Sequence, residues 1–247
     1  MAFETIGHNY GETPLAVEFP SVSATDILKG QLVEISTTTT LTTAPGHVVE
    51  LSGSQTSGAS VAIVGVAAEA RTGSATRSTM KVYIDPNIIF KAPCYVDALP
   101  VSGPLVADAG GNITTLIDAT WGTSAAEDLL IGSYVKCLTL AAPGLNGYNG
   151  QRLLVSDYAT ATGTFTLATL GGTGTWTAAD TYAFLPGVGF IGYKDFAFDA
   201  TMSVIDLGAA AVAARNPFVC VGFGEDSPQG GGYLKVSLRN IPGFVIA

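Results

Sequence analysis

The sequence predicts a mainly β fold: a β-barrel or sandwich body built from both ends of the chain, an inserted small β module with one short helix, and an extended N-terminal arm. Short runs rich in Val, Ile, Thr and aromatic residues recur between Gly, Pro, Ser and Asn, which predicts strands. In the middle of the chain these runs are joined by Gly- and Asn-rich turns, which predicts a separate module. No periodicity persists near the N-terminus, which predicts an arm. The boundaries are 1–25 for the arm, 26–109 and 187–247 for the body, and 110–186 for the module.

The N-terminal arm is punctuated by Gly7, Gly11, Pro14 and Pro20. Ordering such a segment costs about 1–2 kcal/mol of backbone entropy per residue, so it must dock on the body or on a neighbouring molecule. Its apolar side chains have no regular partner of their own, and we expect them to bind a partner protein. These residues are Phe3, Ile6, Leu15, Val17 and Phe19.

The body shows short strands at the spacing typical of a sandwich or barrel. The expected strands span 31–36, 47–51, 61–68, 80–84, 88–90, 218–223 and 233–238. Two pairs of runs look alike: 64–69 with 80–84, and 221–225 with 234–238. We therefore expect each end of the chain to contribute an equivalent hairpin to one barrel.

The module begins with a helix signal. Ser124 and Glu127 form a capping box, which predicts a short helix through about Ile131. Four strands are expected after it, joined by turns in which Gly and Asn supply the positive φ. They span 134–140, 151–157, 164–170 and 181–185. Surface loops tolerate such insertions well, so we expect an independent unit.

Composition limits the classes of partner. Of the 247 residues, 13% are charged and 47% are hydrophobic, which excludes a disordered chain. The net charge is -9 and no basic run occurs, so we expect no nucleic-acid partner. The longest apolar stretches, 60–70 and 208–224, are too short or too interrupted to cross a bilayer, so no membrane partner is expected. The N-terminus lacks the features of a secretory signal, which predicts synthesis in a cytoplasm.

The sequence offers little chemistry, and we expect no catalytic residues, no cofactor and no metal. Its only histidines are His8 and His47, and no Gly-x-Ser-x-Gly motif is present. Residues 187–192 formally match a dinucleotide fingerprint, but a Leu-Pro pair precedes them where a long buried strand is needed. Three widely spaced cysteines are typical of reduced, buried thiols. They are Cys94, Cys137 and Cys220.

Aromatic residues gather in or beside the module, several of them at turns. They either form the small core that a module of this size needs, or they are exposed and stack on a sugar ring or another protein. The candidates for exposed contacts are Trp121, Tyr148 and Trp176.

The module also carries a specific series of short motifs: a Gly-Gln step, an acidic-aromatic corner, Thr-x-Thr-Leu and a closing Asp-Thr-Tyr. They fall at 150–151, 157–158, 164–167 and 180–182. This series resembles a small β module that recurs in structural proteins of tailed bacteriophages. The body, with the runs at 27–33 and 64–67, is similar to small β-barrel proteins that decorate or cement phage capsids.

The resemblance implies a capsid decoration protein, a virion component on the outer capsid surface that bridges joints between coat subunits. Its partners would be the major capsid protein and further copies of itself, with a trimer favoured. It would be made in the host cytoplasm. Members of that family carry no catalytic residues, so none is transferred to this chain.

Three other interpretations stay open. The chain could be a phage tail or fibre component, or a carbohydrate-binding β module that uses the aromatic residues. It could also be a β-rich hydrolase that uses the carboxylates around Asp195 and Glu225.

Overall fold

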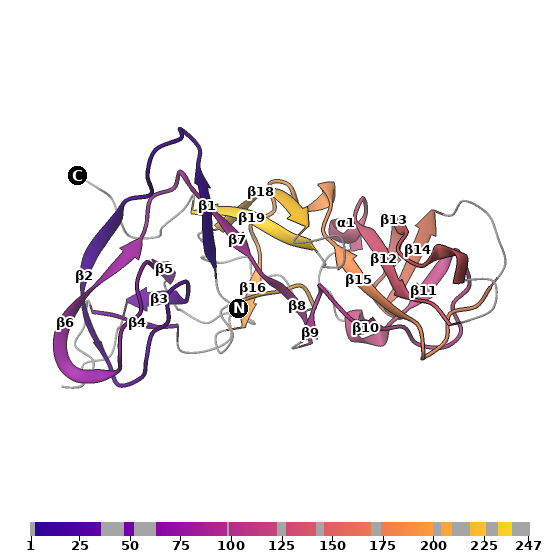
Figure 1. Ribbon diagram of the computed structural model, residues 1–247, viewed down its shortest axis with the longest axis horizontal. Helices are drawn as coiled ribbons and strands as arrows, with labels where there is room; N and C mark the ends of the chain where they lie inside the picture. Colours follow the sequence, from indigo (N-terminus) through magenta and orange to yellow (C-terminus); the bar gives the residue numbers. More distant parts are fainter. Residues whose placement is uncertain are drawn as a thin grey trace.

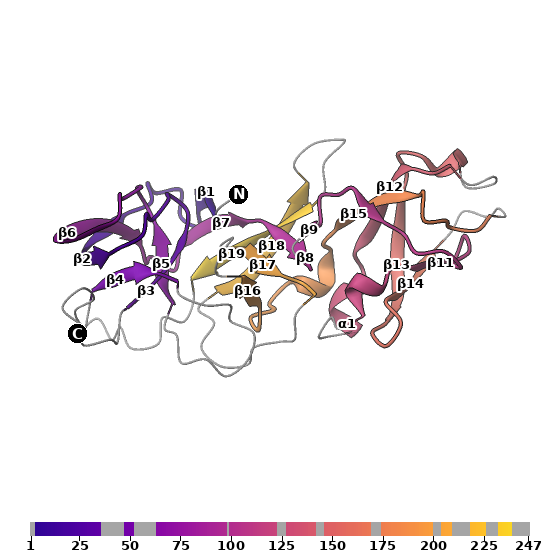
Figure 2. The same cartoon turned by 90° about the horizontal axis from the view of Figure 1, so that it is seen from below.

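The computed structural model describes residues 3–35, 47–51, 63–97, 99–122, 127–141, 146–168, 174–199, 204–208, 218–225 and 232–238. These residues form mainly strands, which confirms the expected fold class. The molecule is elongated, and three parts follow one another along its long axis in two views at right angles (Figures 1 and 2). A closed barrel forms one end, two four-stranded sheets the middle and a six-stranded sheet the other end.

The barrel is built only from residues 16–83. Its strands are β2 (Ala16–Ser23), β3 (Leu32–Ile35), β4 (Val48–Glu50), β5 (Ile63–Ala67) and β6 (Ser74–Tyr83), closed in the order β2-β4-β3-β5-β6. β5 is buried over its whole length. Its Val64 and Ala67 belong to the core inside the barrel, whereas its Ile63 and Val66 belong to the core shared with the rest of the molecule. β5 is therefore the wall between two cores.

One arginine stabilises the barrel where β2 and β6 change register. The register of this pair shifts between Ser21 and Ser23, which leaves carbonyl groups turned out of the regular ladder. The Arg71 guanidinium donates to the carbonyl oxygens of Ser21, Ser23 and Ser74 at 3.3–3.4 Å. Its planar set of donors suits several carbonyl groups at once.

The middle of the molecule combines strands from distant parts of the chain. One antiparallel sheet has the order β1 (Glu4–His8), β7 (Ile88–Ala92), β19 (Gly232–Leu238) and β18 (Phe218–Glu225). The other has the order β16 (Ala197–Asp199), β17 (Val204–Asp206), β8 (Cys94–Val96) and β9 (Leu99–Pro100). The first and last described strands of the chain thus lie in the same sheet.

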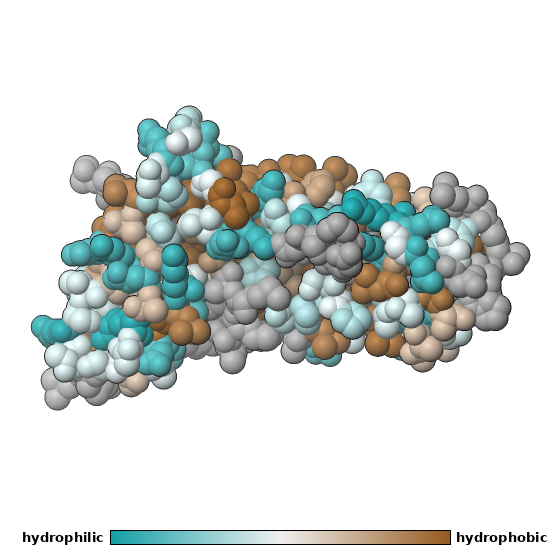
Figure 3. Space-filling view, viewed as in Figure 1, coloured by the Kyte–Doolittle hydropathy of each residue, from teal (hydrophilic) through white to brown (hydrophobic). Residues whose placement is uncertain are grey.

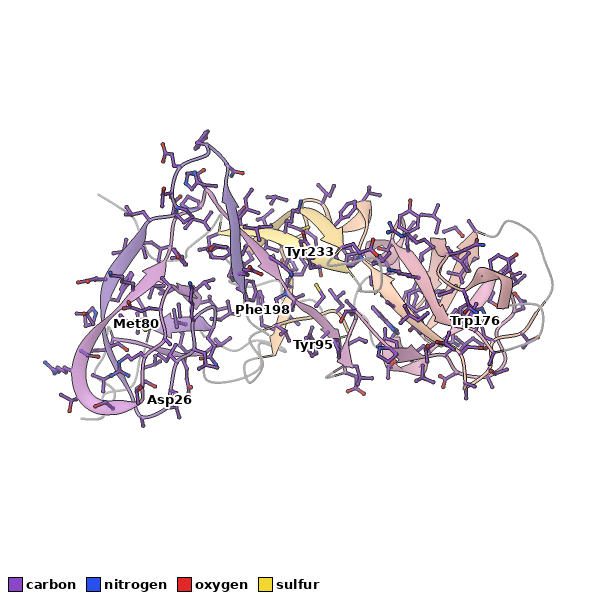
Figure 4. All side chains as sticks on the ribbon, in the orientation of Figure 1. Asp26, Met80, Tyr95, Trp176, Phe198 and Tyr233 are labelled. Atoms are coloured by element: carbon purple, nitrogen blue, oxygen red, sulfur yellow. The ribbon has the colours of Figure 1, made fainter. Side chains whose placement is uncertain are left out.

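An aromatic cluster fills the space between these two sheets. The Phe3 ring centroid lies 6.4 Å from that of Phe90, 6.4 Å from that of Phe198 and 5.1 Å from that of Phe218. Phe198 is labelled in Figure 4, in the middle of the molecule. The four rings come from four separate stretches of chain, so the cluster joins elements that have no local connection.

The third part is a six-stranded sheet drawn entirely from residues 105–185. Its order is β10 (Leu105–Val106), β15 (Thr181–Leu185), β12 (Tyr134–Thr139), β13 (Arg152–Ala159), β14 (Thr164–Ala168) and β11 (Thr115–Ile117). Short helices accompany it: η1 (Ala119–Trp121), α1 (Glu127–Leu130), η2 (Asn146–Tyr148) and, just after β15, η3 (Val188–Phe190). Ser124, the expected helix cap, lies outside the described residues. In the described part of the chain no helix is long and apolar enough to cross a membrane.

The expected single barrel with a hairpin from each end is wrong. Both hairpins exist, as β5–β6 and β18–β19, but only the first belongs to the barrel. β19 instead pairs with β7, with Leu234 opposite Ala92 and Val236 opposite Phe90. A local pattern specifies a hairpin but not the third strand beside it, because that choice depends on contacts distant in sequence.

The expected N-terminal arm also needs correction, because residues 4–8 and 16–23 are strands of two sheets. Pro20 fits in β2 because it lies opposite Thr79 of β6, while the other neighbour, β4, pairs with β2 only at Ser21. Proline removes one backbone donor, which is tolerated where a second ladder is absent. Bulges in β1 and β2 further disrupt the alternation that a strand prediction needs.

We predict that Phe3→Ala lowers the free energy of unfolding by about 3–5 kcal/mol, because it leaves a cavity in the aromatic cluster. Ile6→Ala, three residues further along on β1 and 41% exposed, should cost about 1 kcal/mol or less. Chemical denaturation of the two variants measures both values. Equal effects would show that Phe3 is not part of the core.

Candidate functional site

Of the five apolar residues expected to bind a partner, two are buried and three are exposed. Phe3 and Phe19 are buried, so their assignment to a partner surface is wrong. Phe19 packs inside the barrel, where it lies opposite Met80. The other three, Ile6, Leu15 and Val17, are exposed. The arm is therefore an anchored pair of strands with exposed apolar side chains around its connection.

That connection, residues 9–15, is named the tip. It projects from the body at the upper left of Figure 1. Tyr10 is 75% exposed and Leu15 is 70% exposed, and they are the two most exposed large apolar side chains among the described residues. In Figure 3 the projection is mostly hydrophilic, and hydrophobic atoms gather at its base. Gly11 turns the chain at φ +71, a conformation that strains any residue with a Cβ atom.

A hydrogen-bonded base fixes the tip to the turn between β6 and β7. The buried His8 ring lies with Nε2 at 3.0 Å from Asp85 Oδ2, and the Tyr10 N–H donates to His8 Nδ1 at 3.3 Å. Because Nδ1 accepts, the ring proton is on Nε2 and points to the carboxylate. The Asn9 N–H donates to the Asn87 carbonyl at 2.9 Å, which ties the two connections together.

The Asp85 carboxylate is held in its charged form. Burial acts to raise its pKa, but hydrogen bonds from Asn87 and His8 outweigh burial, so the pKa lies below its ordinary value of 3.8. A carboxyl group with a lowered folded-state pKa contributes stability above its unfolded pKa and loses that contribution as the pH falls through the folded value. The contribution of the Asp85 carboxylate to the base of the tip is therefore present at neutral pH and is lost in acid.

The aromatic residues expected as exposed contacts are buried, which corrects that expectation. Trp121 and Trp176 are almost fully buried, and Tyr148 is 8% exposed. Trp176 is labelled in Figure 4. The ring centroid of Trp121 lies 5.3 Å from that of Phe165 and 4.8 Å from that of Phe184. The module uses these rings as its core, because one sheet with very short helices has few other large side chains to fill it.

Trp121 and two tyrosines bond one another's polar atoms inside the module, whereas the buried Nε1 of Trp176 has no hydrogen-bond partner. The Trp121 Nε1–H donates to the Tyr182 hydroxyl at 2.9 Å, and that hydroxyl donates to Asp118 Oδ2 at 2.6 Å. Burial and the neighbouring charge of Asp118 raise the pKa of Tyr182 well above its ordinary value. The Tyr158 hydroxyl donates to the Trp121 carbonyl. These contacts hold the core and involve the residues that the carbohydrate interpretation would need on the surface.

The three cysteines are free and buried, as expected. Burial raises the pKa of Cys137 to about 12, with a further contribution from the charge of Asp180, and raises that of Cys220 to about 11. Burial also raises the pKa of Cys94. Within the described residues no three His, Cys, Asp or Glu side chains come together to hold a metal ion.

Of the two carboxylates suggested for a hydrolase, that of Glu225 is engaged by two cations, whereas Asp195 is bonded through its backbone carbonyl. Glu225 Oε1 accepts a hydrogen bond from Lys136 Nζ at 2.6 Å, and Oε2 accepts one from Arg152. The Asp195 carbonyl accepts a hydrogen bond from the Tyr193 hydroxyl at 3.2 Å. Asp226, the neighbour of Glu225, lies outside the described residues.

Comparison with protein-family models, with curated proteins and with solved structures found no match to this chain.

The sequence analysis missed two features of the structure. Tyr10 was not singled out, although its position next to Gly11 marks it as a turn residue. The ion pairs of Glu225 were also missed, because Lys136 lies 89 residues away and no local pattern links them.

We predict that a thiol reagent at pH 8 leaves all three cysteines of the native protein unmodified, because the reactive thiolate is scarce and enclosed. Denaturant should release three reactive thiols per chain, which supplies the control count. Rapid modification of any cysteine in the native protein would contradict the burial described for it.

Proposed function

We propose that this chain is a structural protein of a phage virion that binds the outer capsid surface and stabilises contacts between coat subunits. The partner is the major capsid protein, and the chain itself assembles as an oligomer, with a trimer favoured. It is made in the host cytoplasm and reaches its final location on the particle. The sequence resemblance of the module to phage structural proteins motivates this proposal. The exposed tip is the structural feature that supports it best.

The observation that supports docking best is the tip with its fixed base. Tyr10 and Leu15 are the two most exposed large apolar side chains among the described residues, and they belong to a projection that is otherwise mostly hydrophilic. The strands on both sides are anchored by the buried Phe3 and Phe19. Because the base is already ordered, little conformational entropy is lost when the tip enters a concave apolar site.

The overall shape agrees with a bridging role. Three parts lie in a row, so surfaces at opposite ends of the molecule are well separated (Figure 2). A protein that joins neighbouring coat subunits needs separate contact surfaces for each of them. Charge contributes little to such contacts in a chain with 13% charged residues, since exposed ion pairs stabilise by only about 0–1 kcal/mol each.

We predict that the double variant Tyr10→Ser, Leu15→Ser binds particles at least about tenfold more weakly than the natural chain, because hot-spot side chains carry about 2 kcal/mol or more. Binding is measured by co-sedimentation with purified particles from which the protein has been removed. Its melting temperature should stay unchanged, since both side chains are exposed.

Leu28→Ser is the matched control, because Leu28 is 60% exposed but lies in the connection between β2 and β3, outside residues 9–15. It should bind as the natural chain does. Equal binding by all three proteins would place the interface elsewhere. Absence of the natural chain from purified particles would overturn the proposed function itself.

A further inference from the structure

The His8 ring lies between two hydrogen-bond partners at the base of the tip, and its side chain is only 2% exposed. Nε2 lies 3.0 Å from Asp85 Oδ2, and Nδ1 accepts from the Tyr10 N–H at 3.3 Å. The centroid of the Tyr10 ring lies 6.1 Å from that of His8. Because the neutral ring carries its one proton on Nε2, Nδ1 is the only ring atom that can take up a second proton.

Within the described residues, Asp85 is the only charged group that contacts the His8 ring. The facing strand, β7, has one charged residue, Lys91, which lies opposite Glu4 at the other end of β1 and pairs with it at 4.0 Å. The one charged residue of the tip, Glu12, is exposed. The charge state of the ring therefore depends on Asp85 and on the pH of the solvent.

A proton on Nδ1 acts differently on the two partners of the ring. Imidazole side chains take up a proton between about pH 5 and 8. Asp85 keeps its charge over that range, because the pKa of its carboxyl group lies below 3.8. The positive ring therefore binds the Asp85 carboxylate more strongly. On its other side, the new Nδ1–H points at the Tyr10 N–H, so two donors meet and their hydrogen bond is lost.

The backbone that responds to this loss is short. The Asn9 N–H donates to the Asn87 carbonyl at 2.9 Å, and the Gly11 N–H donates to the His8 carbonyl at 3.0 Å. Neither bond involves the imidazole ring, so both persist when the ring is charged. The peptide unit between Asn9 and Tyr10 must then rotate between two held points, which turns the Tyr10 side chain.

We propose that His8 is a pH-sensitive switch that sets the direction of the Tyr10 side chain. When the ring is neutral, it holds the Tyr10 N–H and the Tyr10 ring lies beside it. When the ring is charged, it stays on Asp85 and Tyr10 turns away. Tyr10 is the most exposed large apolar side chain among the described residues, so the switch changes the surface that the tip presents.

The experiment is nuclear magnetic resonance of the isotope-labelled full chain between about pH 8 and 5. The chain has only two histidines, so the His47→Gln variant identifies the ring signals of His8. At the upper pH we expect a proton on Nε2 alone and nuclear Overhauser contacts between the His8 and Tyr10 rings. As the pH falls, Nδ1 should gain a proton, and the ring contacts should be lost with the same midpoint.

Two variants separate the switch from a general effect of acid. His8→Asn retains an acceptor, since its Oδ1 is bonded to Cγ as Nδ1 is, but it cannot titrate. Its Tyr10 signals should therefore not change over this pH range. Asp85→Asn removes the charge that favours the positive ring, so the midpoint should move to lower pH. The melting temperature shows whether each variant is folded, and the natural chain alone suffices to decide the proposal.

Several results would overturn the proposal. One is a proton on Nδ1 at the upper pH, and another is a His8 ring that stays neutral down to the lower pH. Ring contacts that survive protonation would show that Tyr10 does not respond. A pH-dependent change at Tyr10 in folded His8→Asn would assign the response to another group. None of these measurements requires a particle, so the result is independent of the proposed function.

Discussion

One continuous apolar core joins the three parts of the chain, and the other features depend on it. It runs from Ile63 and Val66 on the barrel wall, through Phe3 and its aromatic neighbours, to Trp121 in the module. The barrel keeps a second core inside its closed sheet. Since β5 contributes to both cores, the barrel cannot shift relative to the central sheets without exposing apolar surface on one side.

Polar contacts fix the orientations that the apolar core does not determine. Apolar packing is not directional, so it holds the parts together without fixing their relative orientation. At the barrel end, the His8 and Asp85 pair sets the direction of the tip. At the module end, Glu225 meets Lys136 and Arg152. In a chain with few charges, each of these groups has a specific structural position.

Local patterns predicted β12 to β15 of the module but missed β11 and β10, which lies before the expected boundary at residue 110, and they predicted the assembly of the body poorly. β12 and β15 begin where expected because turn residues flank them on both sides. β16 and β17 have only three residues each, too few for a periodicity to be recognised. For the candidate site, the sequence identified Leu15 as exposed but misplaced Phe3. Phe3 precedes β1, and its burial comes from the rings of Phe90, Phe198 and Phe218, which lie far away in the sequence.

The N-terminal segment consequently has two roles that a truncation cannot separate. Phe3 and Phe19 hold the central sheet and the barrel, while Tyr10 and Leu15, between them in sequence, face outward. Removing residues 2–20 would delete β1 and more than half of β2, so the barrel would lose a strand along with the tip. Loss of binding after such a deletion would then reflect unfolding as much as loss of contact. Only point substitutions at exposed positions test the docking role, because they leave the anchors in place.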